Sequence, residues 1–340
     1  MSKPILGISM GDPAGIGPEI IAMALARPQV HALCRPLVIG DAGVMRNATK
    51  FAGVPLSVRS IEKVGQATFL PGTIDVFDLK NVNPEKFQLG QVSAMAGNAA
   101  FEAVRTMISL AMSDQIAGTV TAPIHKEALF AAGHHFPGHT EIFAHFTGTS
   151  DFTMMLAAEN LRVVHVSTHV SLRKACDAVT KDRVLKVIEL ADDACKKLGI
   201  DRPRIGIAGL NPHASDGGLF GDEERDEIVP AINAAKAKGI DAEGPQPPDT
   251  FFAKAMSGLY DICVAMYHDQ GHIPVKIRGF KFDAAKKAWT SVNGINVSLG
   301  LPIIRTSVDH GTAFDQAGKG TASDASLLDA IEYAAKLAGA

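Results

Sequence analysis

The sequence predicts an α/β protein with two lobes and a largely parallel β-sheet. Short apolar runs alternate with longer amphipathic stretches along the whole chain, which is the pattern of parallel strands joined by helices. With 340 residues, 46% hydrophobic and 20% charged, the chain can bury a core large enough for two domains or for one large bilobed unit. This composition excludes a disordered or fibrous protein.

The N-terminal half contains four predicted strands and one long predicted helix. The helix covers residues 91–112, where alanine and methionine are frequent and the apolar positions recur with helical periodicity. The strands are short apolar runs at residues 4–10, 36–40, 74–77 and 116–120. Their alternation with amphipathic stretches supports a parallel sheet.

The C-terminal half continues the same alternation. Residues 153–158 and 161–166 lie so close together that they predict adjacent strands or a hairpin. Residues 222–238 predict a helix with acidic residues in its first turns, where the helix dipole favours negative charge. The remaining predicted elements are apolar runs at residues 205–210, 261–266 and 303–308, and helices at residues 181–198 and 324–337. Residues 279–294 are polar and basic and predict an irregular surface excursion.

Charge and cysteine usage narrow the class of protein. The net charge is −3 without a long single-sign run, so a nucleic-acid or membrane surface has no electrostatic support, and a small-molecule partner is favoured. The N-terminal apolar run is too short for a signal peptide or a membrane span, which predicts a cytoplasmic protein. The four cysteines are far apart and predict buried, reduced thiols, without a disulfide framework or a cysteine zinc site.

Three histidines each follow a predicted strand: His169, His213 and His268. A strand that ends in a histidine presents an imidazole at the carboxyl edge of the sheet, where open α/β sheets bind ligands. Three imidazoles can hold a divalent metal that keeps a position open for a substrate. The alternative is that each packs or hydrogen-bonds as an ordinary structural histidine, which is our interpretation of His31, His134, His135, His145 and His165.

Other polar residues allow two interpretations each. Residues 11–19, GDPAGIGPE, follow the first strand and precede a helix that could begin at Pro18; they form either a tight structural turn or a loop whose amides approach an anion or cofactor. Lys276 and Arg305 lie in apolar stretches and either extend to the surface or bind a phosphate or carboxylate. The Gly-containing turn at residues 309–313 follows a strand and by itself indicates only a strand-to-loop connection.

Seven motifs together resemble one enzyme family. They occur in order from about residue 4 to the end: GDPAGIGPE, TAPIHKEAL, PGHTE, STHVSLRKA, GLNPHA, AMYHDQGHIPVK and NVSLGLPIIRTSVDHGTA. This set resembles the 4-hydroxythreonine-4-phosphate dehydrogenases, including the catabolic 4-phospho-D-threonate and 4-phospho-D-erythronate dehydrogenases. Details such as GLFGDEE and PPDT are closer to the catabolic branch and favour a four-carbon phosphorylated sugar acid.

The resemblance implies a fold like that of the isocitrate and isopropylmalate dehydrogenases. We expect residues 1–30 and 130–270 to form one α/β lobe that contains the metal ligands, and the remaining segments to form the second lobe. The active site would then lie in the cleft between the lobes. The family functions as a homodimer, so the resemblance implies a metal site with ligands from both subunits.

The resemblance also assigns roles to particular residues. The divalent metal (Zn, Mg, Mn or Co) would be held by His169, His213 and His268. Substrate contacts match His139, Thr140, Lys276, Asn296 and Arg305. The DHGTA turn resembles the adenosine-binding loop of the isocitrate dehydrogenase fold, so the candidates for contact with NAD, or with NADP, are His310, Gly311, Thr312 and Ala313.

The implied reaction is oxidation of a C3 hydroxyl followed by decarboxylation. A metal on that hydroxyl lowers its pKa, a base takes the proton, and hydride leaves for the nicotinamide. The product is a 3-oxo acid, which loses CO2 readily. Lys276 or Asp269 is the proton-transfer residue, and either one could instead orient the substrate or a metal-bound histidine.

Three other functions remain open at this point. A metal-dependent hydrolase could use the same histidines to activate water without a nicotinamide. A two-lobed solute receptor would fit the α/β pattern but would normally carry an export signal. Relatives within the family oxidise cis-dihydrodiol dicarboxylates, whose carboxylates Lys276 and Arg305 could bind as well as a phosphate. The segment at residues 279–294 is longer than in the biosynthetic enzymes and could cover the substrate, contact the partner subunit or have neither role.

Overall fold

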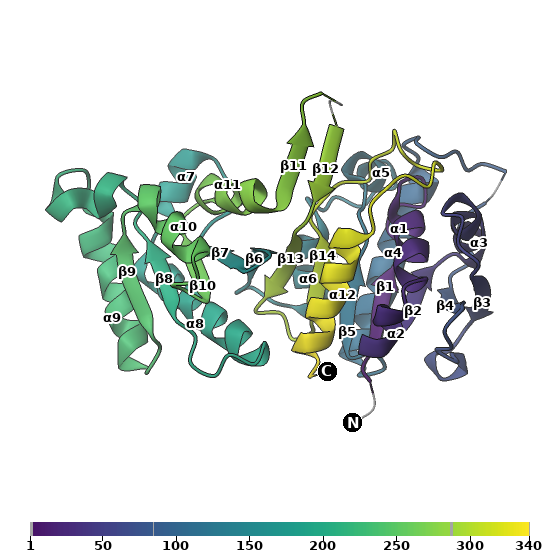
Figure 1. Ribbon diagram of the computed structural model, residues 1–340, viewed down its shortest axis with the longest axis horizontal. Helices are drawn as coiled ribbons and strands as arrows, with labels where there is room; N and C mark the ends of the chain where they lie inside the picture. The colour runs from purple at the N-terminus through teal and green to yellow at the C-terminus, as the bar shows by residue number, and fades with distance from the viewer. Residues whose placement is uncertain (1–2, 84, 286–287, 340) are drawn as a thin grey trace. The chain divides into compact units, whose positions relative to one another are not determined.

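The computed structural model describes residues 3–83, 85–285 and 288–339 (Figure 1). The chain divides into two compact units, Met1–Ser150 with Leu301–Ala340 (unit 1) and Asp151–Gly300 (unit 2). This division differs from the lobes expected from sequence. The first strand, β1 (Ile5–Ser9), pairs with β2 (Arg35–Gly40) and β5 (Gly118–Thr121), and this pairing places residues 1–30 in unit 1.

In the described part of unit 1, the strands follow the order β3-β4-β2-β1-β5-β14, and they pair in parallel. The helices α1, α2 and α12 lie on one side of these strands, and α4 lies on the other (Figure 1). The additional elements of this unit are β3 (Ser57–Ile61), β4 (Thr73–Asp78), β14 (Arg305–Val308), α1 (Gly17–Leu25), α2 (Pro28–Leu33), α3 (Ala42–Phe51), η1 (Val64–Gln66), α4 (Ala94–Met112), α5 (Lys126–Ala131), α6 (His139–Thr147) and α12 (Ala325–Leu337).

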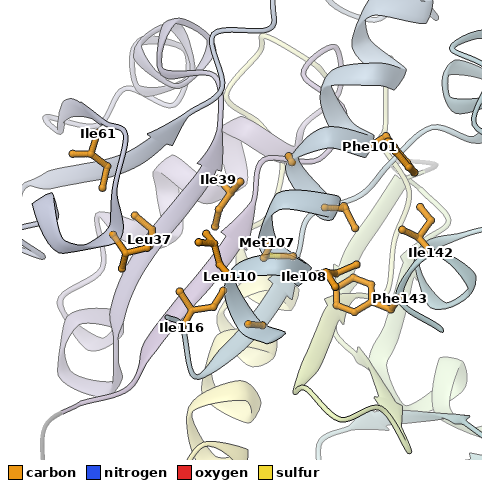
Figure 2. Packing of buried hydrophobic residues seen from close by; sticks show 14 of the residues in the cluster. Leu37, Ile39, Ile61, Phe101, Met107, Ile108, Leu110, Ile116, Ile142 and Phe143 are labelled. Atoms are coloured by element: carbon orange, nitrogen blue, oxygen red, sulfur yellow. The ribbon is translucent and has the colours of Figure 1, made fainter. Parts of the chain in front are cut away.

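The core of unit 1 forms where α4 packs on the sheet. Met107 and Ile108 of α4 are buried together with Leu37 and Ile39 of β2, and Phe143 of α6 extends the cluster (Figure 2). Each such side chain contributes roughly 1.5–3 kcal/mol when it is removed from water. The apolar stripe that predicted a helix at residues 91–112 is therefore the face that packs on the strands.

Among the described residues of unit 2, the strands of the main sheet follow the order β13-β6-β7-β10-β8-β9. Strands β7, β10, β8 and β9 are parallel neighbours, whereas β6 is antiparallel to both β7 and β13. The elements are β6 (Thr153–Ala158), β7 (Leu161–His165), β8 (Ile205–Ala208), β9 (Ala242–Gln246), β10 (Ile262–Ala265), β13 (Ile295–Leu299), α7 (Leu172–Asp177), α8 (Lys181–Lys197), η2 (Pro212–Gly218), η3 (Glu224–Ile228), α9 (Val229–Ala237), α10 (Pro248–Met256) and α11 (His268–Gly279). The mostly parallel α/β fold predicted from the sequence is thus confirmed.

Several local predictions are confirmed and two need correction. Residues 153–158 and 161–166, predicted to be adjacent strands or a hairpin, form the antiparallel pair β6 and β7. The helix predicted at residues 222–238 is a π-helical turn, η3, followed by α9. The segment at residues 279–294, expected to be irregular, contains the antiparallel strands β11 (Phe280–Asp283) and β12 (Ala288–Val292), which pair with each other. Across the described residues, no helix is long and apolar enough to span a membrane.

Candidate active site

Three adjacent parallel strands of unit 2 lead to the three predicted metal ligands. Strand β10 lies between β7 and β8, with Ala265 opposite His165 and Val264 opposite Ile207. His268 begins α11 directly after β10, His169 follows β7, and His213 follows β8. The expectation that each of these histidines follows a strand is therefore confirmed, and the structure adds that the three strands are neighbours.

The structure brings two of these three rings toward each other. The rings of His169 and His268 lie 5.9 Å apart, centroid to centroid. The ring of His213 instead lies 6.2 Å from that of Phe220. Within the part of the chain that the structure describes, no three His, Cys, Asp or Glu side chains are arranged to hold a metal. A metal role for the three histidines therefore stays a prediction.

The chemistry of His268 fits a metal ligand. Its Nδ1 atom lies 2.6 Å from Oδ1 of Asp269. A carboxylate only accepts hydrogen bonds, so Nδ1 carries a proton in this contact, and in the neutral tautomer with that proton Nε2 presents a lone pair. This pairing of a carboxylate with a histidine is the arrangement that orients histidine ligands in metal sites.

His268, His272 and Lys276 form a stripe along α11, because residues four apart lie on the same side of a helix. The ring of His272 stacks on that of His268, with centroids 3.5 Å apart. Burial lowers the pKa of His272 to about 4, and the nearby His268 adds to this effect. The Nζ atom of Lys276 lies 4.2 Å from the centre of the Phe280 ring. His272 is not among the site residues predicted from the sequence, although its spacing of four from His268 is a signal that could have identified it.

Two other residues of unit 2 were given a role from the sequence: His165 as a structural histidine and Asn296 as a substrate contact. His165 is fully buried in β7 and donates from Nδ1 to the carbonyl of Met154 at 3.3 Å, so the structural interpretation of this residue is confirmed. Burial, followed by the charge of His272, lowers the pKa of His165 to about 3. Asn296 lies in β13 opposite Leu156, and its amide donates to the sulfur of Met154.

In unit 1, two of the predicted substrate residues, His139 and Thr140, lie near the buried guanidinium of a third, Arg305. Arg305, at the start of β14, is 3% exposed and donates from Nη2 to Oγ1 of Thr121 at 3.1 Å and from Nη1 to Oγ1 of Thr140 at 3.5 Å. Burial lowers the pKa of Arg305 to about 10, so the group remains charged at neutral pH. Burial, followed by the charge of Arg305, holds the pKa of His139 well below its usual range, so that this ring is neutral. A buried cation beside hydroxyl and neutral imidazole groups suits an anionic group such as a phosphate.

The glycine-rich loop at residues 11–16 packs against the predicted cofactor loop. The amide of Ile16 donates to the carbonyl of Thr312 at 3.0 Å. A Cβ atom at Gly15 would lie only 2.8 Å from that same carbonyl oxygen, so this close approach requires glycine. The carboxylate of Glu19, which is 2% exposed, accepts from the amides of Gly318 and Gly320. The loop therefore supports Thr312, and Glu19 of α1 supports Gly318 and Gly320, so the segment at residues 11–19 has a structural role.

Asp12 and His125 are two polar residues of unit 1 that sequence reasoning did not single out. Asp12 is 1% exposed, and its Oδ1 accepts from the amide of Ala14 at 2.8 Å. Burial raises the pKa of Asp12 to about 6, while the Ala14 amide and His125 act in the opposite direction. The ring of His125 stacks on Phe314, with centroids 4.6 Å apart. Their position next to the predicted cofactor loop is visible only after folding, because residues 12, 125 and 314 are far apart in sequence.

Comparison with known proteins places these features in context. A relative from Cupriavidus necator, named D-threonate 4-phosphate dehydrogenase, is 48% identical over 336 residues, which cover 98% of this chain and 97% of the relative. The crystal structure of a 4-hydroxythreonine-4-phosphate dehydrogenase from Klebsiella pneumoniae superposes with a TM-score of 0.85 at 44% identity, over 99% of this chain and 100% of the other. A terephthalate 1,2-cis-dihydrodiol dehydrogenase from Burkholderia xenovorans superposes with a TM-score of 0.70 at 31% identity, over 98% of each chain.

The fold and these relatives define the class of protein as an oxidoreductase that acts on a CH–OH group with a nicotinamide cofactor. The family described as pyridoxal phosphate biosynthetic protein PdxA matches residues 32–334. The chain belongs to this family.

Proposed function

We propose that this protein oxidises the C3 hydroxyl of a phosphorylated four-carbon hydroxy acid with NAD and a divalent metal, and that decarboxylation follows. The candidate substrates are 4-phospho-D-threonate, 4-phospho-D-erythronate and 4-phosphohydroxy-L-threonine. The observation that carries the proposal is the buried guanidinium of Arg305 beside Thr140 and His139, which suits a phosphate. The names of the relatives from Cupriavidus necator and Klebsiella pneumoniae support the same substrate class.

Different residues of the chain bind the substrate, the metal and the cofactor in the proposed reaction. Arg305, Thr140 and His139 bind the phosphate, and Asn296 contributes a further substrate contact. His169, His213 and His268 are the residues that would hold the metal, and Asp269 keeps His268 in the tautomer that can bind it. When bound, the metal supplies Lewis acidity that lowers the pKa of the substrate hydroxyl. His310, Gly311, Thr312 and Ala313 contact the cofactor.

Lys276 is the proposed proton-transfer residue, because Asp269 is already engaged with His268. Lys276 accepts the C3 hydroxyl proton while hydride moves from C3 to the nicotinamide, which produces a 3-oxo acid and reduced cofactor. Loss of CO2 breaks the C1–C2 bond, and the proton returns to C2. The product is a three-carbon ketone phosphate, which keeps the hydroxyl group of C2 from the two sugar acids or the amino group of C2 from 4-phosphohydroxy-L-threonine.

An absorbance assay tests this proposal directly. Purified protein is mixed with NAD or NADP and each phosphorylated four-carbon acid, with and without EDTA, and the reduced nicotinamide is followed. We expect reduction with at least one phosphorylated acid, and loss of that reduction with EDTA. Absence of reduction with every acid in the presence of metal would contradict the proposal.

A second candidate substrate is a cis-dihydrodiol dicarboxylate. The structural relative from Burkholderia xenovorans favours it, since that protein is named for such a substrate and matches over 98% of this chain. Adding the terephthalate dihydrodiol to the same assay separates the two, because only the phosphorylated acids offer a phosphate to Arg305. The dehydrogenase names of the relatives argue against the hydrolase alternative.

We also propose that the enzyme is a cytoplasmic homodimer with a metal site that is shared between subunits. Several large apolar side chains of unit 2 are exposed in the single chain, as expected for a surface that a second copy covers. They include Leu172 (63% exposed), Leu219 (71%), Ile273 (55%) and Ile277 (72%). Light scattering should give twice the mass of the chain, and a monomer at micromolar concentration would contradict the proposal. The cytoplasm is the proposed compartment because it holds the pool of phosphorylated metabolites and nicotinamide cofactor.

A further inference from the structure

The segment that carries His213 has an unusual backbone. Five consecutive residues, His213 to Gly217, have φ angles of 55°, 53°, 73°, 46° and 72°, and four of the five are not glycine. Left-handed backbone is unfavourable for residues with a Cβ atom, and it persists only where the surrounding structure holds it in place. The position of the His213 ring therefore depends on what anchors the two ends of this segment.

Glu224 anchors the N-terminal end of the segment. Its side chain is 3% exposed, and its Oε1 atom accepts from the amides of Leu210 and Asn211, both at 2.7 Å. Its Oε2 atom accepts from Nδ2 of Asn211 at 2.8 Å. At the other end, the hydroxyl of Ser215 donates to the carbonyl of Gly221. Hydrogen bonds to a buried carboxylate are among the stronger ones in proteins, so Glu224 restrains residues 210–211 tightly.

The contacts of Glu224 distinguish it from an ordinary acidic residue at a helix start. The sequence predicts that acidic residues in this region complement the helix dipole, which would direct their carboxylates to the first amides of their own helix. The recorded hydrogen bonds of Glu224 run instead to Leu210 and Asn211, 14 and 13 residues earlier in the chain. Glu224 also begins the π-helical turn η3, and such turns are frequent at functional sites.

We propose that Glu224 is a positioning residue that holds His213 in place for the metal of the proposed function. It acts through the loop at residues 210–211 and does not itself contact the metal, because two amides and a side-chain amide already occupy its oxygens. The inference rests on the proposed function, since it assumes that His213 is a metal ligand.

Cobalt binding to the full-length protein tests this role. The Co²⁺ affinity and the visible spectrum of the Co²⁺ form are measured for wild type, Glu224→Ala and His213→Ala. Asp226→Ala is the matched control, because Asp226 lies in the same turn but pairs with Arg225 at the surface. We expect Glu224→Ala to weaken Co²⁺ binding about 10- to 100-fold, the range typical when a partner that orients a metal ligand is removed. Its spectrum should shift toward that of His213→Ala, while Asp226→Ala matches wild type.

Two further variants keep the test decisive. Glu224→Gln retains an oxygen that can accept from both backbone amides, so it should restore most of the affinity and the wild-type spectrum. If circular dichroism shows that Glu224→Ala does not fold, Glu224→Asp replaces it, because the shorter side chain keeps its charge but withdraws from the two amides. We expect Glu224→Asp to show the same weakening as Glu224→Ala.

The outcomes separate this inference from the proposed function. The positioning role would be overturned if Glu224→Ala had the Co²⁺ affinity and spectrum of wild type, whatever its melting temperature. The same holds for Glu224→Asp where that variant replaces Glu224→Ala. A lowered melting temperature alone, with unchanged cobalt binding, would mean that Glu224 is merely structural. Failure of the wild-type protein to bind Co²⁺ would overturn the proposed metal dependence, and the inference with it.

Discussion

The Oδ1 atom of Asp269 lies 2.6 Å from Nδ1 of His268, the residue next to it in sequence. The first residues of α11 thus place a carboxylate against one ring nitrogen of His268, and Nε2 is the ring atom that would bind the metal. The contact gives Asp269 a partner, whereas the sequence left Asp269 and Lys276 as equal candidates for proton transfer. It supports an orienting role for Asp269 and leaves the chemical step to Lys276.

Replacing Asp269 should therefore affect metal binding more than chemistry. In Asp269→Ala the ring of His268 loses the acceptor that fixes its tautomer, so metal affinity should fall about 10- to 100-fold. At saturating metal, kcat of Asp269→Ala should stay near the wild-type value. Asp269→Asn keeps an acceptor oxygen, so its metal affinity should fall less than that of Asp269→Ala. Metal titrations with the nicotinamide assay measure both quantities. A large loss of kcat at saturating metal would instead make Asp269 the proton-transfer residue.

Replacing Lys276 should lower kcat and leave metal binding unchanged, the opposite of the result expected for Asp269. Lys276→Met keeps the length of the side chain and its packing near Phe280 but cannot accept a proton. We expect kcat to fall by about 10²- to 10⁴-fold with unchanged metal content, the usual range for loss of a general base. Lys254→Met, on the surface of α10, is the control. Equal effects of the two lysine changes would contradict the assignment.

Replacing Arg305 tests the phosphate site. Arg305→Met removes a charged, buried donor, and KM for the phosphorylated acid should rise about 10- to 100-fold, as expected from the loss of roughly 1.5–3 kcal/mol in hydrogen bonds to a charged group. Arg305→Lys should reverse only part of the increase in KM, because lysine lacks the planar, bidentate guanidinium of arginine. Steady-state kinetics measure the effect, with the exposed Arg59→Met as the control. A variant whose turnover of the unphosphorylated acid falls equally would show that Arg305 does not recognise the phosphate.

Glu19 should control cofactor affinity from a distance. Its carboxylate holds the amides of Gly318 and Gly320, which follow the predicted cofactor loop. We expect Glu19→Ala to lower the free energy of unfolding by about 2 kcal/mol and to raise KM for NAD while KM for the acid stays unchanged. Glu19→Gln keeps one of the two hydrogen bonds, so its free energy of unfolding and its KM for NAD should lie between those of wild type and Glu19→Ala. Equal increases in the two KM values would remove the link between Glu19 and the cofactor.

Asp12 should make stability depend on pH. Burial raises its folded-state pKa from the ordinary value of 3.8 to about 6, so the folded protein keeps a proton that the unfolded chain releases between these values. The contribution of Asp12 to stability is therefore fully present below pH 3.8 and is lost as the pH rises through about 6.

Asp12→Asn cannot ionise and escapes this loss. Its free energy of unfolding relative to wild type should rise by about 2–3 kcal/mol between about pH 4 and about pH 8. Urea unfolding at both pH values measures the difference. A difference that does not change with pH would mean that Asp12 titrates normally in the folded protein.

Much of the fold follows from local patterns in the chain. The apolar runs became β1, β2, β4 and β5 in unit 1, and the periodic stretch at residues 91–112 became α4, because each pattern matches the geometry of one element. The division into units did not follow, since residues 301–340 rejoin the N-terminal 150 residues through the pairing of β14 with β5. Pairing between strands so far apart in sequence leaves no local signal.

The features of the candidate site also separate into those predicted from local sequence and those that only the folded structure shows. Sequence alone was enough to place His169, His213 and His268 after strands and to assign the chain to a dehydrogenase family, because strand ends and motifs are written in consecutive residues. The tertiary structure was needed to show that Asp269 turns to His268, that Glu224 holds the loop of His213, and that Glu19 supports the predicted cofactor loop. Glu224 and Glu19 act on residues 13 to 301 positions away, and a hydrogen bond of that kind exists only once the chain has folded.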